Sequence, residues 1–240
     1  MRLSYTKLDL YEFCPHAYRL RYLERLPIPF SPALLVGSSV HTALRGLFER
    51  LRDGLSATWD DLLDVYARYW DEAPNIDPVR DRPTWERGLG LLRGYWDANV
   101  ENLGRPILLE ARFFFRLPNA TRHTVEGYVD RVDALGSGVE IIDYKSGRSP
   151  ETLGASLHTQ LQTYALAAEH AFGHRVERLT AYFLSDNRKH SIQSAHIDAE
   201  FVTARYQYAG DAIANNQFEA TPGSHCATCD YANRCEFRAG

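Results

Sequence analysis

The sequence predicts an α/β protein with a sheet that is partly antiparallel. The first hundred residues show the helical spacing of apolar side chains, and three β-rich runs follow between residues 106 and 145. A helical segment then separates the third run from a further pair of strands. Antiparallel neighbours need only a short turn, whereas parallel neighbours need a crossover, usually a helix. The order of elements therefore predicts a meander of three strands followed by one helical crossover.

The composition is that of an ordinary soluble globular protein, and it limits the classes of function. The 240 residues, 45% hydrophobic and 24% charged, suffice for one large domain or two small ones. With a net charge of −4, any contact with a polyanion must come from a local basic patch or a metal ion. The N-terminus lacks the apolar core of a signal peptide, and no run approaches the ~18 apolar residues of a membrane span. We expect a cytoplasmic protein without a membrane partner.

Helices are predicted at three places in the first hundred residues. Gly37–Arg52 carries apolar residues at helical spacing. Thr58, followed three residues later by Asp61, resembles an N-cap ahead of a second helix. Trp85–Val100 is the third helix, and the prolines of residues 74–83 predict a loop before it.

The later elements follow from β-branched and aromatic runs, from helical spacing and from turn residues. In chain order, we expect strands at 106–117, 123–135 and 139–145, a helix at 156–172, a hairpin of strands at 177–185 and 190–196 around Asp186-Asn187, a helix from its cap Asp198 to about Asn216, and an irregular cysteine-bearing tail from Thr221.

An acid and a base interrupt the apolar strand at 139–145. Side chains alternate faces along a strand, so Asp143 and Lys145 share one face. Gly136-Ser137 is expected to form a two-residue hairpin turn with glycine first. That turn sets a register in which Asp130 of the preceding strand lies directly opposite Asp143, with the Cβ atoms ~5 Å apart.

Two carboxylates this close repel each other unless a cation lies between them. Mg²⁺ is typically held by one or two carboxylates with water and substrate phosphates. Lys145, on the same face, would offset charge on a phosphate or activate a water. The pattern thus favours a metal-dependent phosphodiesterase centre, although an Asp-x-Lys spacing alone also fits an ion pair on a solvated face.

A second acidic pair falls on the other face of the same two strands. The same register places Asp133 opposite Glu140. Arg131 shares their face and is expected to neutralise them, so we interpret this pair as structural.

Five motifs occur in an order that resembles the RecB-like branch of the PD-(D/E)XK nuclease superfamily. They are SYTKLDLYEFCPHAYRLRY at 4–22, GSSVH at 37–41, GYVDR at 127–131, DYKSG at 143–147 and QLQTY at 160–164. The resemblance implies a restriction-endonuclease-like mixed sheet core of order αβββαβ, with a helical N-terminal part and a cysteine-bearing C-terminal tail. It also implies one nuclease domain over residues 1–240, divided into a mainly helical part at 1–105, the sheet core at 106–197 and a final helix with the tail at 198–240.

The resemblance further implies a cation site for Mg²⁺ or Mn²⁺. Its ligands would be Asp130 and Asp143, with the Tyr144 carbonyl completing the set and His41 as an additional ligand. From the residues alone, His41 is equally consistent with a histidine packed in the core. Glu110, in the first strand, is left as an accessory to the site or an exposed side chain.

On the substrate side, the resemblance makes Lys145 the catalytic lysine. Gln160 and Tyr164 lie one helical turn apart on one face, and the family uses this pair near the substrate backbone. Simple packing also explains both residues. Arg148, just beyond the strand, is the candidate phosphate contact.

The four cysteines indicate a metal, because disulfides are uncommon in the cytoplasm. Cys226, Cys229 and Cys235 lie close together near the C-terminus, while Cys14 lies near the N-terminus. A zinc ribbon usually pairs two close knuckles, so this layout fits zinc less well. The resemblance implies a [4Fe–4S] cluster that ties the two ends of the chain together, with Zn²⁺ as the alternative.

The expected activity is hydrolysis of DNA phosphodiester bonds, most simply as an exonuclease on single-stranded ends in DNA repair and recombination. A helicase would then be a fitting partner. One alternative is a CRISPR-associated nuclease that processes spacer precursors with an integrase partner. Another is a non-catalytic iron–sulfur module that binds nucleic acid.

Overall fold

The computed structural model describes residues 1–74, 76–117 and 122–239. Its chain divides into two compact units. We call Met1–Phe30, Phe113–Gly127 and Asp198–Gly240 the terminal unit, and Ser31–Arg112 and Tyr128–Ile197 the central unit. Among the described residues, none of the helices has the length and apolar character needed to cross a bilayer. That residues 1–240 act as one nuclease domain stays a prediction.

A mixed sheet confirms the α/β fold expected from the sequence. Its order is β1-β3-β4-β5-β6, with β2 also paired to β3. The strands are β1 (Arg2–Leu3), β2 (Pro106–Arg116), β3 (Thr124–Leu135), β4 (Gly138–Lys145), β5 (Val176–Phe183) and β6 (Arg188–Gln193). β3 and β4 are antiparallel, β4 and β5 parallel, and β5 and β6 antiparallel. The meander, the helical crossover and the final hairpin are therefore all present.

The hairpin between β3 and β4 has the expected register. Gly136 has a φ of 59°, a left-handed conformation that suits glycine, and Leu135 pairs with Gly138. Asp133 consequently pairs with Glu140. The turn sequence alone was enough to align the two strands.

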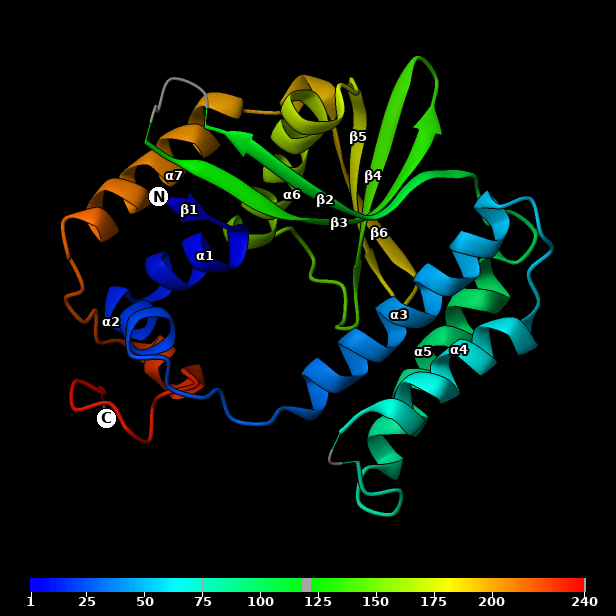
Figure 1. Cartoon of the computed structure of the whole chain (residues 1–240), viewed down its shortest axis with the longest axis horizontal. Helices are drawn as coiled ribbons and strands as arrows, with labels where there is room; N and C mark the ends of the chain where they lie inside the picture. The colour runs from blue at the N-terminus through cyan, green and yellow to red at the C-terminus, as the bar shows by residue number, and fades with distance from the viewer. Residues whose placement is uncertain (75, 118–121, 240) are drawn as a thin grey trace. The chain divides into compact units, whose positions relative to one another are not determined.

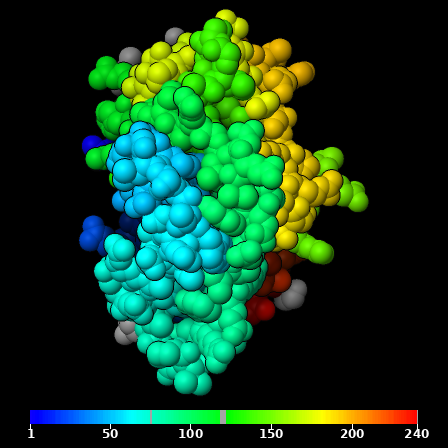
Figure 2. Space-filling view, turned by 90° about the vertical axis from the view of Figure 1, so that its right-hand side faces the viewer, coloured from blue at the N-terminus to red at the C-terminus, as the bar shows by residue number. Residues whose placement is uncertain are grey.

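The helices of the central unit that precede the sheet are α3 (Pro32–Arg52), α4 (Trp59–Glu72) and α5 (Arg82–Asn99), which pack against one another (Figure 1). Thr58 and Asp61 form the capping box expected at α4. The apolar faces of these helices share a core with Ile142 and Tyr144 of β4. Figure 2 shows these helices, in blue to teal, covering one side of the central unit.

α6 (Ala155–Ala167) is the crossover between β4 and β5, and it continues into a π-helical turn, η2 (Ala168–Phe172). Side chains of α6 contact Asp143, which alternates with Ile142 and Tyr144 along β4. α6 therefore lies on the face of the sheet opposite α3–α5. Because the second half of α6, Leu161–Ala167, is buried, polar side chains there need hydrogen-bond partners, which the sheet provides for Tyr164.

The terminal unit contains both ends of the chain. Its helices are α1 (Tyr5–Phe13), α2 (Pro15–Tyr18), η1 (Arg19–Leu23), α7 (Ala199–Ala214) and η4 (Ser224–Thr228). α1 and α7 lie side by side (Figure 1). The side chain of Asp198 accepts a hydrogen bond from the N–H of Phe201 and so caps α7, as expected.

Several bounds differ from the sequence-based expectation, among them the start of α3 at Pro32 instead of Gly37 and the end of β5 at Phe183 instead of residue 185. β6 ends at Gln193, because residues 194–196 form a 3₁₀ turn, η3 (Ser194–His196), closed by a hydrogen bond from Ile197 N–H to Ser194 O. α5 begins at Arg82, with Pro83 in its first turn, so the predicted loop at 74–83 is two residues shorter. Asn75 of that loop lies outside the described residues. β1 was not predicted, because two residues are too few to show an alternating pattern.

Candidate active site

Asp130 lies where the β3–β4 ladder ends. The paired residues stop at Arg131 and Ile142, so Asp130 and Asp143 are not themselves a backbone pair. Oδ2 of Asp130 instead accepts a hydrogen bond of 2.9 Å from the main-chain N–H of Tyr144. A carboxylate thus takes the place of a main-chain acceptor at this position. The arrangement holds the end of β4 against an acidic side chain.

A group of three side chains from three elements could hold a cation. One ligand atom each of His41, Glu110 and Asp130 lies within 4.8 Å of the others. His41 comes from α3, Glu110 from β2 and Asp130 from β3. Nδ1 of His41 is 3.3 Å from Oδ1 of Asp130, and its Nε2 is 3.0 Å from the Tyr144 carbonyl oxygen. The imidazole therefore links the acids to the main chain of β4.

The electrostatics of this group favour positive charge. Burial lowers the pKa of His41, but Asp130, with smaller contributions from other acids including Glu110, outweighs burial and raises it to about 9. Burial and the charge of Asp130 both raise the pKa of Glu110. A glutamate whose pKa is raised by burial and by a neighbouring acid, beside a histidine whose pKa is raised to about 9, forms a site that a divalent cation would stabilise.

Glu110 has a backbone conformation that non-glycine residues rarely adopt. Its φ is 43°, although it lies inside β2. Strained backbone of this kind costs about 1–3 kcal/mol and is concentrated at functional sites. The sequence showed only an acid in an apolar strand and left its role open. The structure places its carboxylate with His41 and Asp130.

Asp143 is the most deeply buried acid of the site, with only 3% of its surface exposed. Oδ1 accepts hydrogen bonds from Tyr164 at 2.9 Å and from Gln160 at 3.2 Å. Oδ2 lies 2.7 Å from Nζ of Lys145. Burial raises the pKa of Asp143, Asp130 raises it further, and the lysine opposes both. The three neighbours therefore hold this carboxylate in one orientation.

Lys145, Gln160 and Tyr164 form one hydrogen-bonded chain. Nζ of Lys145 donates to Oε1 of Gln160 at 2.7 Å, and Nε2 of Gln160 donates to the Tyr164 hydroxyl at 2.8 Å. Gln160 and Tyr164 are one turn apart on α6, as the sequence indicated. The Lys145 side chain is 29% exposed, so its amine is accessible to a substrate as well as to Asp143.

The structure brings the proposed nuclease residues together in the central unit. They are His41, Asp130, Asp143, Tyr144, Lys145, Gln160 and Tyr164. Asp143 is not a member of the three-residue group that contains Asp130. Arg148 lies three residues after Lys145, is exposed, and makes no ion pair with any described residue.

The second acidic pair is neutralised by two different arginines. Arg131 is buried and donates to both carboxylate oxygens of Asp133, as expected. Glu140 instead accepts hydrogen bonds from Arg178 at 2.7 Å and from the Thr180 hydroxyl at 2.6 Å. The sequence alone did not predict Arg178 as the partner of Glu140. Arg178 lies on β5, and it is the parallel pairing of β4 with β5 that places it beside Glu140.

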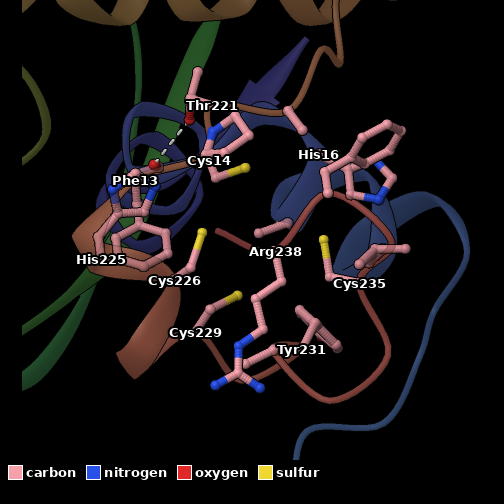
Figure 3. Close-up of a pocket in the computed structure, with 16 residues that line it drawn as sticks. Phe13, Cys14, His16, Thr221, His225, Cys226, Cys229, Tyr231, Cys235 and Arg238 are labelled. Atoms are coloured by element: carbon pink, nitrogen blue, oxygen red, sulfur yellow. Dashed lines mark hydrogen bonds between the residues drawn. The ribbon is translucent and has the colours of Figure 1, made fainter. Parts of the chain in front are cut away.

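The four cysteines surround one pocket in the terminal unit (Figure 3). Cys14 precedes α2, while Cys226, Cys229 and Cys235 come from the C-terminal tail. The sulfur atoms of these four residues point toward a shared space. All four thiols are free and half-buried.

The environment of Cys14 favours its thiolate. Burial raises the pKa of this thiol, but hydrogen bonds from the backbone at Thr221, Ala17 and His16 outweigh burial and lower it. Burial raises the pKa of the Cys229 thiol, and the neighbouring cysteines add to the effect. Four thiols around one pocket, one of them with a lowered pKa, suit a bound metal centre.

Comparisons with known proteins agree with this geometry. A sequence model of the family described as the PD-(D/E)XK nuclease superfamily matches residues 2–236. A CRISPR-associated exonuclease, Cas4 of Francisella tularensis subsp. novicida, is 26% identical over 162 residues, which cover 60% of this chain and 79% of that protein. The Gene 69 protein of Mycobacterium phage L5 is 21% identical, over 97% of this chain and 95% of that protein.

A solved structure extends the likeness to the fold. The crystal structure of a candidate exonuclease from Eubacterium rectale superimposes with a TM-score of 0.62 and covers 100% of this chain and 90% of that one. The sequence identity is 12%, so this likeness concerns the fold alone. The mixed sheet and its helices fit the restriction-endonuclease-like fold that the sequence motifs led us to expect.

Proposed function

Because the chain belongs to the PD-(D/E)XK nuclease superfamily, we propose that it hydrolyses DNA phosphodiester bonds in a reaction that depends on Mg²⁺ or Mn²⁺. The observation that carries the proposal is the group of His41, Glu110 and Asp130, with Lys145 held beside Asp143. Cation ligands and a positioned amine are the parts that phosphodiester hydrolysis needs.

The donor set fits a divalent cation. Carboxylate oxygens are the ligands that Mg²⁺ and Mn²⁺ prefer, and an imidazole is compatible with Mn²⁺. His41, Glu110 and Asp130 would hold the ion, with Asp143 and the Tyr144 carbonyl as further ligands. When bound, the cation would neutralise charge on the phosphate and lower the pKa of a water molecule.

The residues of β4 and α6 would then position the lysine. Gln160 accepts a hydrogen bond from the amine of Lys145, and the same amine is also in contact with the carboxylate of Asp143. Tyr164 in turn fixes the carboxylate of Asp143 through its hydroxyl. Lys145 would thus be held in place to orient the attacking water and to stabilise the negative charge that develops on the phosphate. Arg148 would contact a phosphate of the strand.

The substrate is proposed to be the end of a single DNA strand, in repair or recombination, as in the RecB-like branch that the motifs resemble. A second function, trimming of spacer precursors during CRISPR adaptation, is favoured by the 26% identity to a Cas4 exonuclease. The two functions would involve different partners, a helicase for the first and an integrase for the second.

The cysteines are proposed to hold a [4Fe–4S] cluster as a structural clasp. Cys14 is far from the other three cysteines in the sequence, yet all four thiols line one pocket, as a cluster that joins both ends of the chain requires. A zinc ribbon usually pairs two close knuckles, so this layout supports the cluster over Zn²⁺.

Cleavage of labelled DNA tests the proposed activity. Single- and double-stranded DNA, labelled at the 5′ or the 3′ end, would be incubated with Mn²⁺ or Mg²⁺, with and without EDTA. We expect cation-dependent shortening of single strands, and loss of at least ~100-fold in rate for Lys145→Ala. Unchanged cleavage in EDTA or by the variant would refute the mechanism. Binding without any cleavage would favour the non-catalytic iron–sulfur module.

A further inference from the structure

The loop that follows Lys145 is attached to the β5–β6 hairpin at three points. The hydroxyl of Ser185 donates to the carbonyl oxygen of Gly147 at 2.8 Å. The N–H of Ser149 donates to Asp186 at 3.3 Å, and its Oγ lies 2.7 Å from Nε2 of His190. Arg148 lies between two of these attachment points. Its backbone is therefore fixed relative to the hairpin, although its side chain is exposed.

The register of the sheet places a second arginine next to this loop. Lys145 pairs with Phe183 across the parallel strands, and Phe183 pairs with Arg188 across the hairpin. Laterally paired residues point to the same face of a sheet. Arg188 therefore lies in the same row and on the same face as Lys145, two strands away, a backbone separation of about 10 Å.

The local charge around the two arginines is positive. Arg148 and Arg188 are exposed, and neither makes an ion pair with a residue that the structure describes. The nearby acids are Asp186, whose carboxylate already accepts from the N–H of Ser149, and Glu151, an exposed residue three positions after Arg148. In Figure 2, side chains of the yellow-green segment that follows β4 project from the surface beside the yellow segment of β6. Two cations at this edge are available to a polyanion.

We propose that Arg188 and Arg148 together bind the phosphate next to the scissile one on a single-stranded nucleic acid. The contact between Ser149 and His190 positions the loop that carries Arg148. This assignment rests on the proposed function, because it takes the site beside Lys145 as the place of cleavage. Arginine suits the role, since its guanidinium group can form two parallel hydrogen bonds with one phosphate.

Salt dependence of binding tests the phosphate contact of Arg188. Affinity for a fluorescein-labelled single strand would be measured from about 50 to 300 mM salt in the Lys145→Ala background, where the DNA stays intact. Each phosphate contact contributes about 0.7 to the slope of log K against log salt for single strands. Arg188→Ala should reduce the slope by about 0.7 and weaken binding several-fold, whereas Arg188→Lys should keep the slope and lose part of the affinity.

Arg68→Ala is the matched control. Arg68 is an exposed arginine on α4 and also lacks an ion pair with the described residues. Its variant should bind DNA with an unchanged slope. If Arg188→Ala and Arg68→Ala give the same slope as the parent, the inference is overturned.

A double-mutant cycle tests the positioning role of His190. His190→Phe keeps a ring against Phe183, which the histidine contacts edge-on at 5.6 Å between centroids, but loses the hydrogen bond to Ser149. We expect Arg148→Ala to weaken binding several-fold in the parent and much less in the His190→Phe background. Equal effects in both backgrounds would exclude the positioning role.

The outcomes separate this inference from the proposed function. If the wild-type protein cuts DNA but Arg188→Ala leaves the salt slope unchanged, the phosphate site is wrong and the nuclease assignment stands. If Arg188→Ala reduces the salt slope of binding but the wild-type protein does not cut DNA, the phosphate site stands and the nuclease assignment fails.

Discussion

The carboxylate of Asp130 accepts a hydrogen bond from the main-chain N–H of Tyr144 at the point where β3 and β4 stop pairing. The same side chain lies 3.3 Å from the imidazole of His41. One acid therefore both terminates the ladder and faces the candidate cation group. Its structural and chemical roles can be separated by substitution.

Asp130→Asn should separate these two roles. The amide oxygen can still accept from Tyr144 N–H, but the negative charge beside His41 and Glu110 is gone. We expect a folded protein with Mn²⁺ affinity reduced at least tenfold, measured by calorimetry. Asp130→Ala, which also loses the acceptor, should be less stable than Asp130→Asn by about 1 kcal/mol in urea unfolding. Equal Mn²⁺ binding by Asp130→Asn and the parent would contradict the ligand role.

Glu110 offers a test of strain at the site. Glycine adopts the φ of 43° without cost, so Glu110→Gly should release backbone strain. We expect this variant to be more stable than Glu110→Gln by about 1 kcal/mol, while both lose cleavage activity. The glutamine variant is the control, because it removes the charge and keeps the strained backbone. A glycine variant that is less stable than the glutamine variant would show that the strain is not released.

The Glu140 network predicts a pH dependence of stability. Burial raises the pKa of Glu140, but hydrogen bonds from Arg178 and Thr180 outweigh burial and lower it below 4.5. An acid whose pKa is lowered on folding adds stability above its unfolded-state pKa, and this stability is lost as the pH falls through the folded-state pKa. Glu140→Gln should therefore be less stable than the parent at neutral pH, and the difference should shrink below about pH 4.5.

Urea unfolding at a series of pH values measures this effect. Glu86→Gln is a suitable control, because Glu86 pairs with Arg82 on the exposed surface of α5 and little stability is expected from such a pair. A stability difference for Glu140→Gln that stays constant down to pH 3 would contradict the prediction.

The cysteines can be tested by their spectrum and by their effect on the terminal unit. Anaerobically purified protein should contain about four irons and show the broad visible absorbance of an iron–sulfur cluster. Cys235→Ser and Cys14→Ala should lose both the absorbance and part of the stability, because a cluster that joins the two ends of the chain contributes folding free energy. A metal content of one zinc and no iron per chain would show that the cysteines bind Zn²⁺ and not an iron–sulfur cluster. A Cys14→Ala protein as stable and as active as the parent would exclude the clasp.

Local signals in the sequence determined much of the fold. Gly136-Ser137 was sufficient to align β3 with β4, since a two-residue turn leaves one register. The capping residues Thr58 and Asp198 marked the start of their helices. Alternation placed Asp143 and Lys145 on one face, and the structure shows them in contact.

Contacts that depend on tertiary geometry could not be predicted in the same way. The role of Glu110 depends on a left-handed backbone inside β2, which no residue pattern encodes. The end of the ladder at Arg131 and Ile142 depends on how β3 and β4 separate, so the direct pairing of Asp130 and Asp143 was expected but is absent from the ladder. Arg188 is aligned with Lys145 only through two successive strand pairings, that of β4 with β5 and that of β5 with β6.

Anomalous scattering from a crystal grown with Mn²⁺ would locate the bound cation. We expect a peak within ligating distance of His41, Glu110 and Asp130, and its loss in crystals of Asp130→Asn. A crystal of active protein with no manganese at these side chains, or with manganese bound elsewhere in the central unit, would contradict this expectation.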